Sequence, residues 1–286
     1  MPLTKNKSVL LIAGPTASGK SAVAIAQAQA RGGVIINADS MQVYRELRIL
    51  TARPSVEEEQ RVPHRLFGHI GGAEAYSTAA WLAEAEIEIQ KGWANGQLPI
   101  ICGGTGLYFT ALEQGLAKLP TIDPEIREKW RNFQGDLHQE LQQRHPESAA
   151  RLNAADRQRI IRSLEVFEST GRPLIEWQKI AQQESVLRDC NVERIFMNVP
   201  REELYARAGR RFDTMIEQGA VEEIRALPNL DSAQPLMKAI GVPELLSHLK
   251  GELSLEDAKT KAKTATRNFI KRQMTWFRGQ MKNWHL

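Results

Sequence analysis

One octapeptide restricts the possible folds of this chain more than any other segment. Residues 14–21 read GPTASGKS and match the pattern G-x-x-x-x-G-K-[ST] at every specified position. An apolar run from Ser8 to Ala13 precedes the octapeptide, and a helical pattern from Lys20 to about Arg31 follows it. This strand–loop–helix order is the context in which such a loop binds phosphate. The sequence therefore predicts a P-loop, whose members are Gly14, Pro15, Thr16, Ala17, Ser18, Gly19, Lys20 and Ser21.

The residue types of this loop suit a polyphosphate. Glycines allow successive backbone N–H groups to turn toward a phosphate, and the N-terminus of the following helix adds the positive end of its dipole. Lys20 supplies a point charge to the phosphates, and the hydroxyl of Ser21 is placed to hold Mg²⁺. The loop by itself does not say what happens to the phosphates.

Three further apolar segments, 34–36, 98–102 and 193–199, are candidates for buried strands. They are separated by helical stretches, which is typical of a parallel, doubly wound sheet. Between the last two segments the pattern changes to successive helices rich in Gln, Glu and Arg, and after the last one it is helical again. We therefore predict an α/β fold: a P-loop NTPase-like parallel sheet core with a helical insertion domain and a helical C-terminal region. The expected core is 1–118 with 191–286, and the expected insertion is 119–190.

Composition sets limits of a different kind. The 286 residues are 42% apolar and 25% charged, which is ordinary for a globular protein that buries a core. The two cysteines, Cys102 and Cys190, lie far apart, which excludes a disulfide framework and a cysteine-rich zinc site. The first apolar run is interrupted by Gly14 and Pro15 and is too short to cross a membrane. We expect a soluble protein of the cytoplasm.

The distribution of charge is more informative than the net charge of +4. The segment after Asp257 holds eight cations and no acid, and four aromatic residues lie among these cations. Such a segment is typical of a surface that binds a polyanion, but it also fits a basic amphipathic helix whose aromatic residues are core. A second basic group, Arg157, Arg159 and Arg162, lies on a helix predicted over 156–169. Two separate basic surfaces favour a polyanionic partner without excluding the alternative.

Two short segments follow predicted strands and should meet the P-loop at one edge of the sheet. Asp39 follows the strand 34–36, and Gly103-Gly104-Thr105-Gly106 follows the strand 98–102. At that edge Asp39 could take a proton from an O–H or N–H nucleophile while the P-loop holds the electrophile. No acid ends the strand before Gly103, so a Walker-B carboxylate for hydrolysis is not evident there, and group transfer is favoured. Asp39 also fits a cap or turn residue, and the glycine-rich segment also fits a tight turn.

Ten motifs in a fixed order, the P-loop among them, identify a family. They are GPTASGKS (14–21), ADSMQVY (38–44), TARP (51–54), VPHRL (62–66), YS (76–77), LPIICGGTGLYF (98–109), DRQRIIRSLEVFESTGRP (156–173), RRFDTMIEQG (210–219), AIG (239–241) and TRNFIKRQMTWFR (266–278). With these motifs the chain resembles the bacterial tRNA dimethylallyltransferases, also called isopentenyl-tRNA transferases, over nearly its whole length.

The resemblance implies a reaction and its partners. A dimethylallyl group passes from dimethylallyl diphosphate to the exocyclic N6 amine of the adenosine on the 3′ side of the anticodon, and diphosphate is released. The tRNAs are those that read codons beginning with U. The P-loop would bind the diphosphate of the prenyl donor rather than ATP, with Mg²⁺ as the cofactor. The implied partners are the anticodon stem-loop of tRNA and dimethylallyl diphosphate, and we expect a monomer with no membrane partner.

The resemblance also assigns roles to residues. Lys20 and Arg211 would neutralise the leaving diphosphate, which Thr16 and Ser18 help to hold, and Asp39 would accept the amine proton. The implied catalytic residues are Asp39, Lys20, Arg211 and Thr105. The target base would leave the anticodon-loop stack and enter a channel that meets the donor from the opposite side. The basic C-terminal helix would hold tRNA phosphates. The implied tRNA contacts are Asp39, Ser40, Met41, Gln42, Thr105, Arg127, Gln158, Arg159, Ile160, Ile161 and Arg162.

Four positions depart from the family pattern. Leu50 occupies a place that is usually glycine, Arg48 stands where an acid is common, Val242 replaces a common aromatic residue after AIG, and the usual proline is missing before Tyr76-Ser77. None of these positions lies in the P-loop or among the implied catalytic residues. We expect the first two to affect the loop from 45 to 54, and with it the way in which the base enters.

Two other functions share part of the pattern. An ATP-dependent kinase of small molecules or nucleosides would also use a P-loop and a carboxylate after the second strand, but it leaves the insertion and the two basic surfaces unexplained. A non-catalytic RNA-binding protein would bind tRNA in a salt-sensitive manner without modifying it. The intact Gly-Lys-Ser triplet argues against this second alternative.

Overall fold

The computed structural model divides the chain into two compact units. The first unit comprises Met1–Ala111 and Asp189–Leu286, and the second comprises Leu112–Arg188. The boundaries expected from the sequence were 118/119 and 190/191. The structure describes all residues except 1–6, 118, 182–184, 228–232, 282–283 and 285–286. Three parts of the sequence predictions therefore lie outside the described residues. They are the first residue of the expected core, residue 118 at its expected boundary, and Lys282 of the basic C-terminal segment.

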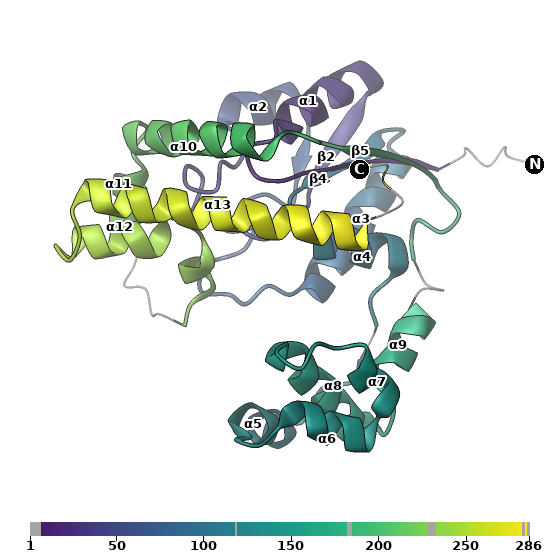
Figure 1. The fold of residues 1–286 in the computed structure, drawn as a ribbon. Helices are drawn as coiled ribbons and strands as arrows, with labels where there is room; N and C mark the ends of the chain where they lie inside the picture. The colour runs from purple at the N-terminus through teal and green to yellow at the C-terminus, as the bar shows by residue number, and fades with distance from the viewer. Residues whose placement is uncertain (1–6, 118, 182–184, 228–232, 282–283, 285–286) are drawn as a thin grey trace, which may run out of the picture. The chain divides into compact units, whose positions relative to one another are not determined.

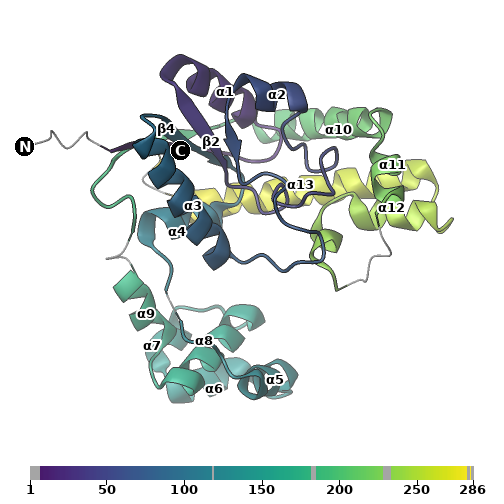
Figure 2. The same cartoon turned by 180° about the vertical axis from the view of Figure 1, so that it is seen from behind.

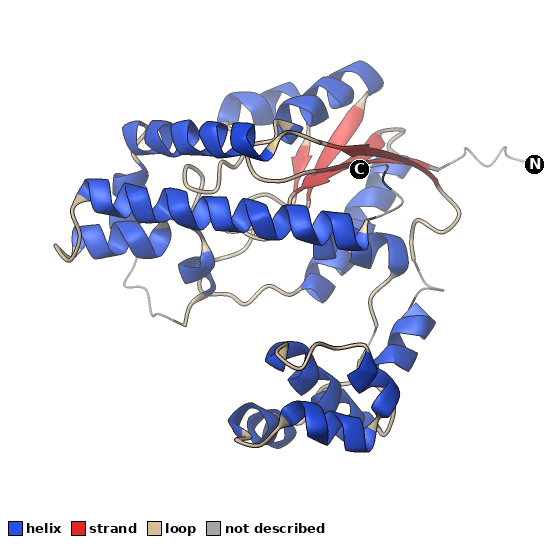
Figure 3. Ribbon diagram, in the orientation of Figure 1, coloured by secondary structure: helices blue, strands red, loops and turns tan. Residues whose placement is uncertain are grey.

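The first unit is built on a parallel sheet, drawn in red in Figure 3. Its strands have the order β3-β2-β4-β1-β5, and each neighbouring pair is parallel. The bounds are β1 (Ser8–Ala13), β2 (Gly33–Asn37), β3 (His64–Arg65), β4 (Leu98–Gly103) and β5 (Asn191–Phe196). The four strands predicted from apolar runs are confirmed, although β5 begins and ends earlier than predicted. Strand β3 was not predicted, because two residues are too few to show a periodicity.

The register of the strands sets the place of the site. Ala13 at the end of β1 pairs with Gly103 at the end of β4 and with Phe196 at the end of β5, and Asn37 at the end of β2 pairs with Cys102. The P-loop, the Asp39 segment and the glycine-rich segment therefore begin side by side at the carboxyl edge. This is the edge at which open α/β sheets bind ligands.

Helices cover the sheet (Figures 1 and 2). On α1 (Lys20–Arg31) the small and branched side chains of Ala24, Ile25 and Ala28 are buried, and they pack on alternate residues of β1, β2 and β4. Helix α3 (Thr78–Ala94) also contacts β2 and β4 and buries Trp81, whose indole N–H donates to the carbonyl oxygen of Asn37 at 2.7 Å. The unit also contains α2 (Val56–Arg61), and α4 (Gly106–Gln114) follows β4.

The C-terminal part of the first unit is helical, as predicted. It contains α10 (Arg201–Glu217), α11 (Ala220–Arg225), the 3₁₀ helix η2 (Pro235–Lys238), α12 (Val242–Leu249) and the long α13 (Leu255–Gln280), which runs beside α10 and α12 (Figure 1). On α13 the aromatic Phe277 is buried and packs edge to face on Phe196 of β5. Its cations Lys259 and Lys263 pair with Asp213 of α10. Much of the basic segment after Asp257 therefore lies in an amphipathic helix whose aromatic residues face the core. This is the arrangement that the sequence analysis left open as the alternative to a surface that binds a polyanion.

The second unit is a small helical bundle, drawn in teal in Figure 1. Its helices are α5 (Pro124–Asn132), α6 (Leu137–Arg144), α7 (Pro146–Ala150), α8 (Arg157–Thr170) and α9 (Leu174–Ala181). Aspartates at 123, 136 and 156 cap α5, α6 and α8 by accepting backbone N–H groups of the first turn. The predicted fold class, a P-loop NTPase-like parallel α/β core with a helical insertion and a helical C-terminal region, is confirmed. Among the helices that the structure describes, none combines the length and the apolar character needed to cross a membrane.

Candidate active site at the carboxyl edge of the sheet

The P-loop leaves β1 and turns directly into α1. Gly19 has a φ of 89° and precedes the helix without a side-chain cap, and no acid lies in the first turn of α1. The positive end of the helix dipole and its free N–H groups are therefore open to an anion. The hydroxyl of Ser18 is buried and has no hydrogen-bond partner in the structure. A buried unpaired hydroxyl fits a loop that is completed by a phosphate oxygen.

Three charged side chains from different elements come together beside this loop. Burial lowers the pKa of Lys20, the nearby Asp39 carboxylate raises it, and the guanidinium of Arg211 lowers it. Burial likewise lowers the pKa of Arg211, while Asp39 raises it. The three groups that the sequence placed on α1, after β2 and on α10 therefore interact electrostatically. Two cations and one carboxylate leave one excess positive charge, which suits a diphosphate.

Cys102 lies in the same electrostatic environment, at the end of β4. Burial is the main cause that raises the pKa of its thiol to about 11. The thiol is therefore protonated at neutral pH, and it is not an activated nucleophile.

Hydrogen bonds between side chains and backbone groups hold Asp39 in place. Asn37 is fully buried, its Oδ1 accepts the N–H of Asp39 at 2.8 Å, and its Nδ2 donates to the carbonyl oxygen of Asp39 at 2.9 Å. The Oδ1 of Asp39 accepts the N–H of Met41 at 2.9 Å. One carboxylate oxygen thus shapes the turn, as the cap or turn interpretation expected, and this leaves the other oxygen available for chemistry.

The glycine-rich segment packs against the Asp39 segment. The N–H of Thr105 donates to the carbonyl oxygen of Ala38 at 3.0 Å, and Thr105 Oγ1 accepts the N–H of Ser40 at 2.9 Å. Gly103 is required here, because a β-carbon at this position would clash with the backbone of Ala38. The hydroxyl of Thr105 therefore serves the loop that carries Asp39, a role that the sequence did not suggest.

Gln42 is held by backbone groups. Its Nε2 donates to the carbonyl oxygens of Thr51 and Ala52, at 2.9 and 3.0 Å, so both of its N–H groups are engaged within the chain. Its Oε1 is the atom of the amide that these two hydrogen bonds leave unused. Met41, one residue earlier, is half-buried and packs against the core beneath this loop.

The loop from 45 to 54, where two departures from the family pattern lie, is firmly anchored. The carboxylate of Glu223 on α11 accepts the backbone N–H groups of Arg48, Ile49 and Leu50, at 2.7, 2.7 and 3.0 Å. The side chain of Leu50 is buried in the core, and Arg48 pairs with Glu59 at 3.3 Å. Leucine and arginine therefore fit at these two positions. Glu223 was not among the predicted residues, since nothing near it in sequence marks it as a partner of this loop.

The predicted tRNA contacts of the second unit lie on α5 and α8. Gln158 and Arg159 are exposed and Arg127 is half-buried, while Arg162 is partly exposed and pairs with Glu165 at 3.2 Å. Ile161 is half-buried against the core. The prediction for Ile160 needs correction, because its side chain is 0% exposed within the core of the bundle and offers no surface to RNA. Its role is packing.

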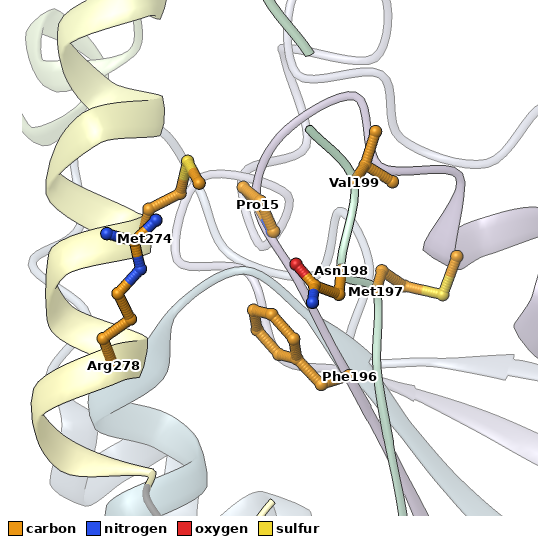
Figure 4. A pocket seen from close by; sticks show the side chains of 7 residues that line it. All are labelled: Pro15, Phe196, Met197, Asn198, Val199, Met274 and Arg278. Atoms are coloured by element: carbon orange, nitrogen blue, oxygen red, sulfur yellow. The ribbon is translucent and has the colours of Figure 1, made fainter. Parts of the chain in front are cut away.

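A cavity of about 290 Å³ lies on the β5 side of the P-loop (Figure 4). Its lining is mainly apolar, with Pro15 of the P-loop facing Met274 of α13, and it carries two polar side chains, those of Asn198 and Arg278. The sequence gave no indication of this cavity, because its walls come from three distant segments. It borders the P-loop on the side of β1 away from β4 and β2, the strands that lead to Thr105 and Asp39.

The donor set of the P-loop fits Mg²⁺. Ser21 follows Lys20 in the first turn of α1, and both line a small cavity with Cys102 and Gln42. Mg²⁺ prefers oxygen ligands, keeps several waters and takes substrate phosphates as ligands, and in P-loop proteins the hydroxyl that follows the lysine is one of its protein ligands. Ser21 would hold such an ion.

Comparison with known proteins shows which family has this sequence and this fold. The family model described as IPP transferase matches residues 42–280, and the one described as isopentenyl transferase matches residues 7–67. The chain belongs to the IPP transferase family. Among relatives in this family, the tRNA dimethylallyltransferase of Azorhizobium caulinodans is 52% identical over 282 residues, which cover 96% of this chain and 90% of the relative. The tRNA dimethylallyltransferase of Rhodopseudomonas palustris is 50% identical over 279 residues, which cover 95% of this chain and 88% of the relative.

Solved structures of IPP transferase relatives have the same fold. The tRNA isopentenylpyrophosphate transferase of Bacillus halodurans superimposes with a TM-score of 0.66 at 32% identity, over 96% of this chain and 88% of that one. A eukaryotic dimethylallyltransferase acting on tRNA gives a TM-score of 0.80 at 28% identity, over 95% of this chain and 70% of that one. The resemblance stated from motifs is therefore confirmed, and the alternative of a kinase is not favoured.

Proposed function

We propose that this IPP transferase transfers a dimethylallyl group from dimethylallyl diphosphate to the N6 amine of the adenosine on the 3′ side of the anticodon, in tRNAs that read codons beginning with U. The observation that carries the proposal is the meeting of Lys20, Asp39 and Arg211 beside one P-loop. A general acid–base carboxylate next to two cations suits a reaction that loses a proton at one end and an anion at the other. The names of the relatives support the same reaction.

The reaction balances with these residues. The lone pair of the N6 amine forms a bond to C1 of the dimethylallyl group, while the bond from C1 to the diphosphate oxygen breaks. Allylic carbon tolerates positive charge, so the barrier depends on how well the departing diphosphate is stabilised. Lys20, Arg211, the hydroxyl of Ser18 and the N-terminus of α1 surround that charge. Asp39 takes the proton that the amine loses.

The chain's own residues also prepare the site for Mg²⁺. Ser21 would hold the ion against the diphosphate, and the ion would supply further positive charge to the leaving group. Removal of divalent metal with a chelator should abolish turnover. Ser21→Ala should raise the Mg²⁺ concentration needed for half-maximal rate several-fold without loss of tRNA binding.

The acceptor must leave its stack to reach Asp39. Extruding one base costs a few kcal/mol, and the cost is smaller in a single-stranded loop than in a duplex. Ser40, Met41 and Gln42 follow Asp39 directly and would contact the flipped nucleotide, with Gln42 Oε1 as an acceptor. The exposed Gln158 and Arg159 of α8, together with Arg127 and Arg162, would contact the anticodon stem-loop. We expect the protein to act as a monomer, in the cytoplasm where tRNA is modified.

A labelling experiment separates this function from that of a kinase. Unmodified tRNA is incubated with the protein and Mg²⁺, in one reaction with radiolabelled dimethylallyl diphosphate and in another with γ-labelled ATP. The proposal predicts acid-precipitable label only from the prenyl donor, and this label should disappear with the Lys20→Ala variant. Acid-precipitable label only from ATP would refute it.

A further inference from the structure

Gln273 connects two loops that no other described polar side chain joins. It lies in α13 and is only 6% exposed. Its Oε1 accepts the backbone N–H of Thr16 in the P-loop at 2.9 Å, and its Nε2 donates to the carbonyl oxygen of Gly104 at 2.9 Å. The two partners fix the orientation of the side-chain amide of Gln273. Its oxygen must face the N–H of Thr16, and its nitrogen must face the carbonyl oxygen of Gly104. A side chain of the same size without both a donor and an acceptor cannot replace it.

One of these loops is the P-loop, which would bind the prenyl donor, and the other contacts the segment that carries Asp39. Thr16 belongs to the diphosphate cradle, three residues before Gly19 opens α1. Gly104 is followed by Thr105, whose Oγ1 accepts the N–H of Ser40, next to Asp39. Hydrogen bonds on either side of the Gly104–Thr105 peptide link therefore connect the P-loop, through Gln273, to the segment that carries Asp39.

We propose that Gln273 is a positioning residue, which fixes the P-loop and the Gly104–Thr105 loop relative to one another and so sets the distance from the prenyl donor to Asp39. The inference rests on the prenyl transfer proposed above. Bond formation needs reacting atoms held about 3–3.5 Å apart, and a displacement of 1 Å costs about a hundredfold in rate. A residue that touches neither substrate can therefore affect turnover strongly.

The packing around the bridge explains why a tether is needed. The cavity of about 290 Å³ lies between Pro15 and Met274, the neighbours in sequence of Thr16 and Gln273 (Figure 4). Beside Pro15 the P-loop therefore borders a cavity, whereas Ala17 packs against the core cluster of Leu204, Ala208 and Ile270. The part of the loop next to the cavity can shift when the bridge is broken. In the loop after β4, a β-carbon on Gly104 would lie 2.5 Å from Gln273 Nε2. A side chain at position 104 would therefore displace the amide of Gln273. Glycine at 104 and glutamine at 273 are thus a matched pair.

Three variants test the bridge. Gln273→Met keeps the volume and removes both hydrogen bonds, and Gly104→Ala disturbs the bridge from the opposite loop. Gln273→Glu keeps the acceptor for Thr16 but sets a carboxylate against the Gly104 carbonyl, until protonation restores a donor. The control is Ile89→Ala, a fully buried core position of α3 that belongs to neither loop. Single-turnover rate constants, donor KM, tRNA Kd and melting temperature are measured for each.

We expect Gln273→Met and Gly104→Ala to lower the rate constant at saturating donor and tRNA at least about tenfold, with tRNA Kd unchanged. For Gln273→Glu, burial raises the pKa of the introduced carboxyl group, so the rate relative to wild type should rise as pH falls from 8.5 to 6. The ratio cancels the titration of groups shared by both proteins, such as Lys20. A pH-independent ratio, or losses no greater than that of Ile89→Ala at equal melting temperature, would overturn the proposal. Should Gln273→Met fail to fold, the pH ratio of Gln273→Glu decides.

Amide hydrogen exchange separates this inference from the proposed function. Peptides that cover 12–19 and 103–108 should both exchange faster in Gln273→Met, and neither should do so in Ile89→Ala. Faster exchange in only one of the two loops would overturn the bridge even if the enzyme is active. Faster exchange in both, with a wild-type protein that transfers no prenyl group, would refute the proposed function and leave the bridge intact.

Discussion

Thr105 Oγ1 accepts the backbone N–H of Ser40 at 2.9 Å and thereby ties the loop after β4 to the loop that carries Asp39. The two segments follow adjacent parallel strands, so their proximity comes from the sheet, but their fixed separation comes from this bond and from the pairing of Thr105 N–H with Ala38. The geometry of Asp39, the proposed proton acceptor, thus depends on residues that do not themselves take the proton.

Different substitutions separate the role of Asp39 in its turn, which the structure shows, from its proposed role as proton acceptor. Asp39→Asn keeps an oxygen that can accept the N–H of Met41 and so preserves the turn, whereas Asp39→Ala loses it. Both variants lack a base, and we expect single-turnover rates to fall about 10²- to 10⁴-fold in each. Only the alanine variant should show altered exchange around residues 39–44. An asparagine variant that retains more than a tenth of the wild-type rate would exclude Asp39 as the proton acceptor.

The lowered pKa of Lys20 predicts how diphosphate binding depends on pH. Because burial lowers this pKa below its ordinary value of 10.5, the free protein loses the charge at a lower pH than an exposed lysine would. Bound diphosphate favours the charged form, so affinity should fall, and proton uptake on binding should grow, as pH rises through the pKa of the free protein. Calorimetric titration with inorganic diphosphate from pH 7 to 10 measures both.

Lys20→Ala is the control for this titration, since the ligand's own protonation is the same with both proteins. We expect the variant to bind diphosphate about 10- to 100-fold more weakly at pH 7, and the difference to shrink at high pH. Parallel pH profiles for the two proteins would show that Lys20 does not contact the diphosphate.

Glu223 should stabilise the loop from 45 to 54. Its carboxylate accepts three backbone N–H groups, and Glu223→Ala leaves them without this partner. We expect a loss of about 2–3 kcal/mol in the free energy of unfolding and faster amide exchange over 48–50. The matched control is Glu222→Ala, which removes an exposed neighbour paired with Arg225 and should cost less than about 1 kcal/mol. Equal losses in both variants would contradict the anchoring role.

The second unit offers a test that separates packing from RNA contact. Ile160→Ala should destabilise the unit by about 2–5 kcal/mol, because it leaves a cavity among Trp130, Leu137 and Leu164. Arg159→Ala should leave stability unchanged and reduce the dependence of log Kd for tRNA on log salt by about one unit. A stable Ile160→Ala protein with weakened tRNA binding would show that the correction for this residue is wrong.

The sequence predicted those elements of the fold that have a recognisable local pattern of residues. Strand β1 and helix α1 were predicted with their observed bounds, because a short apolar run and a phosphate-loop pattern define both ends. Strand β3 was not predicted, because its two residues, His64 and Arg65, are too few to show a periodicity. The mistake at Ile160 was avoidable, since Ile160 and Leu164 are apolar at a spacing of four residues and so mark the core face of α8.

The site was predicted only where a residue's chemistry is recognisable by itself. Lys20, Asp39 and Arg211 carry charges that suit the reaction, and the structure brings them together. Asn37, Glu223 and Gln273 were missed because each acts on backbone groups. For Gln273, the partner in the P-loop is 257 residues away in sequence. Backbone partners leave no mark on residue type, so only the folded chain reveals them.

The central claim is that this protein attaches a dimethylallyl group to an adenosine of tRNA. The most direct measurement incubates the purified protein with unmodified tRNA, Mg²⁺ and dimethylallyl diphosphate, and then determines the masses of the nucleosides and of the nuclease fragments. We predict an adenosine heavier by one dimethylallyl group, found only in the fragment that contains the position 3′ to the anticodon, and absent with Asp39→Asn. Unmodified nucleosides from a wild-type protein that still binds tRNA would contradict the account.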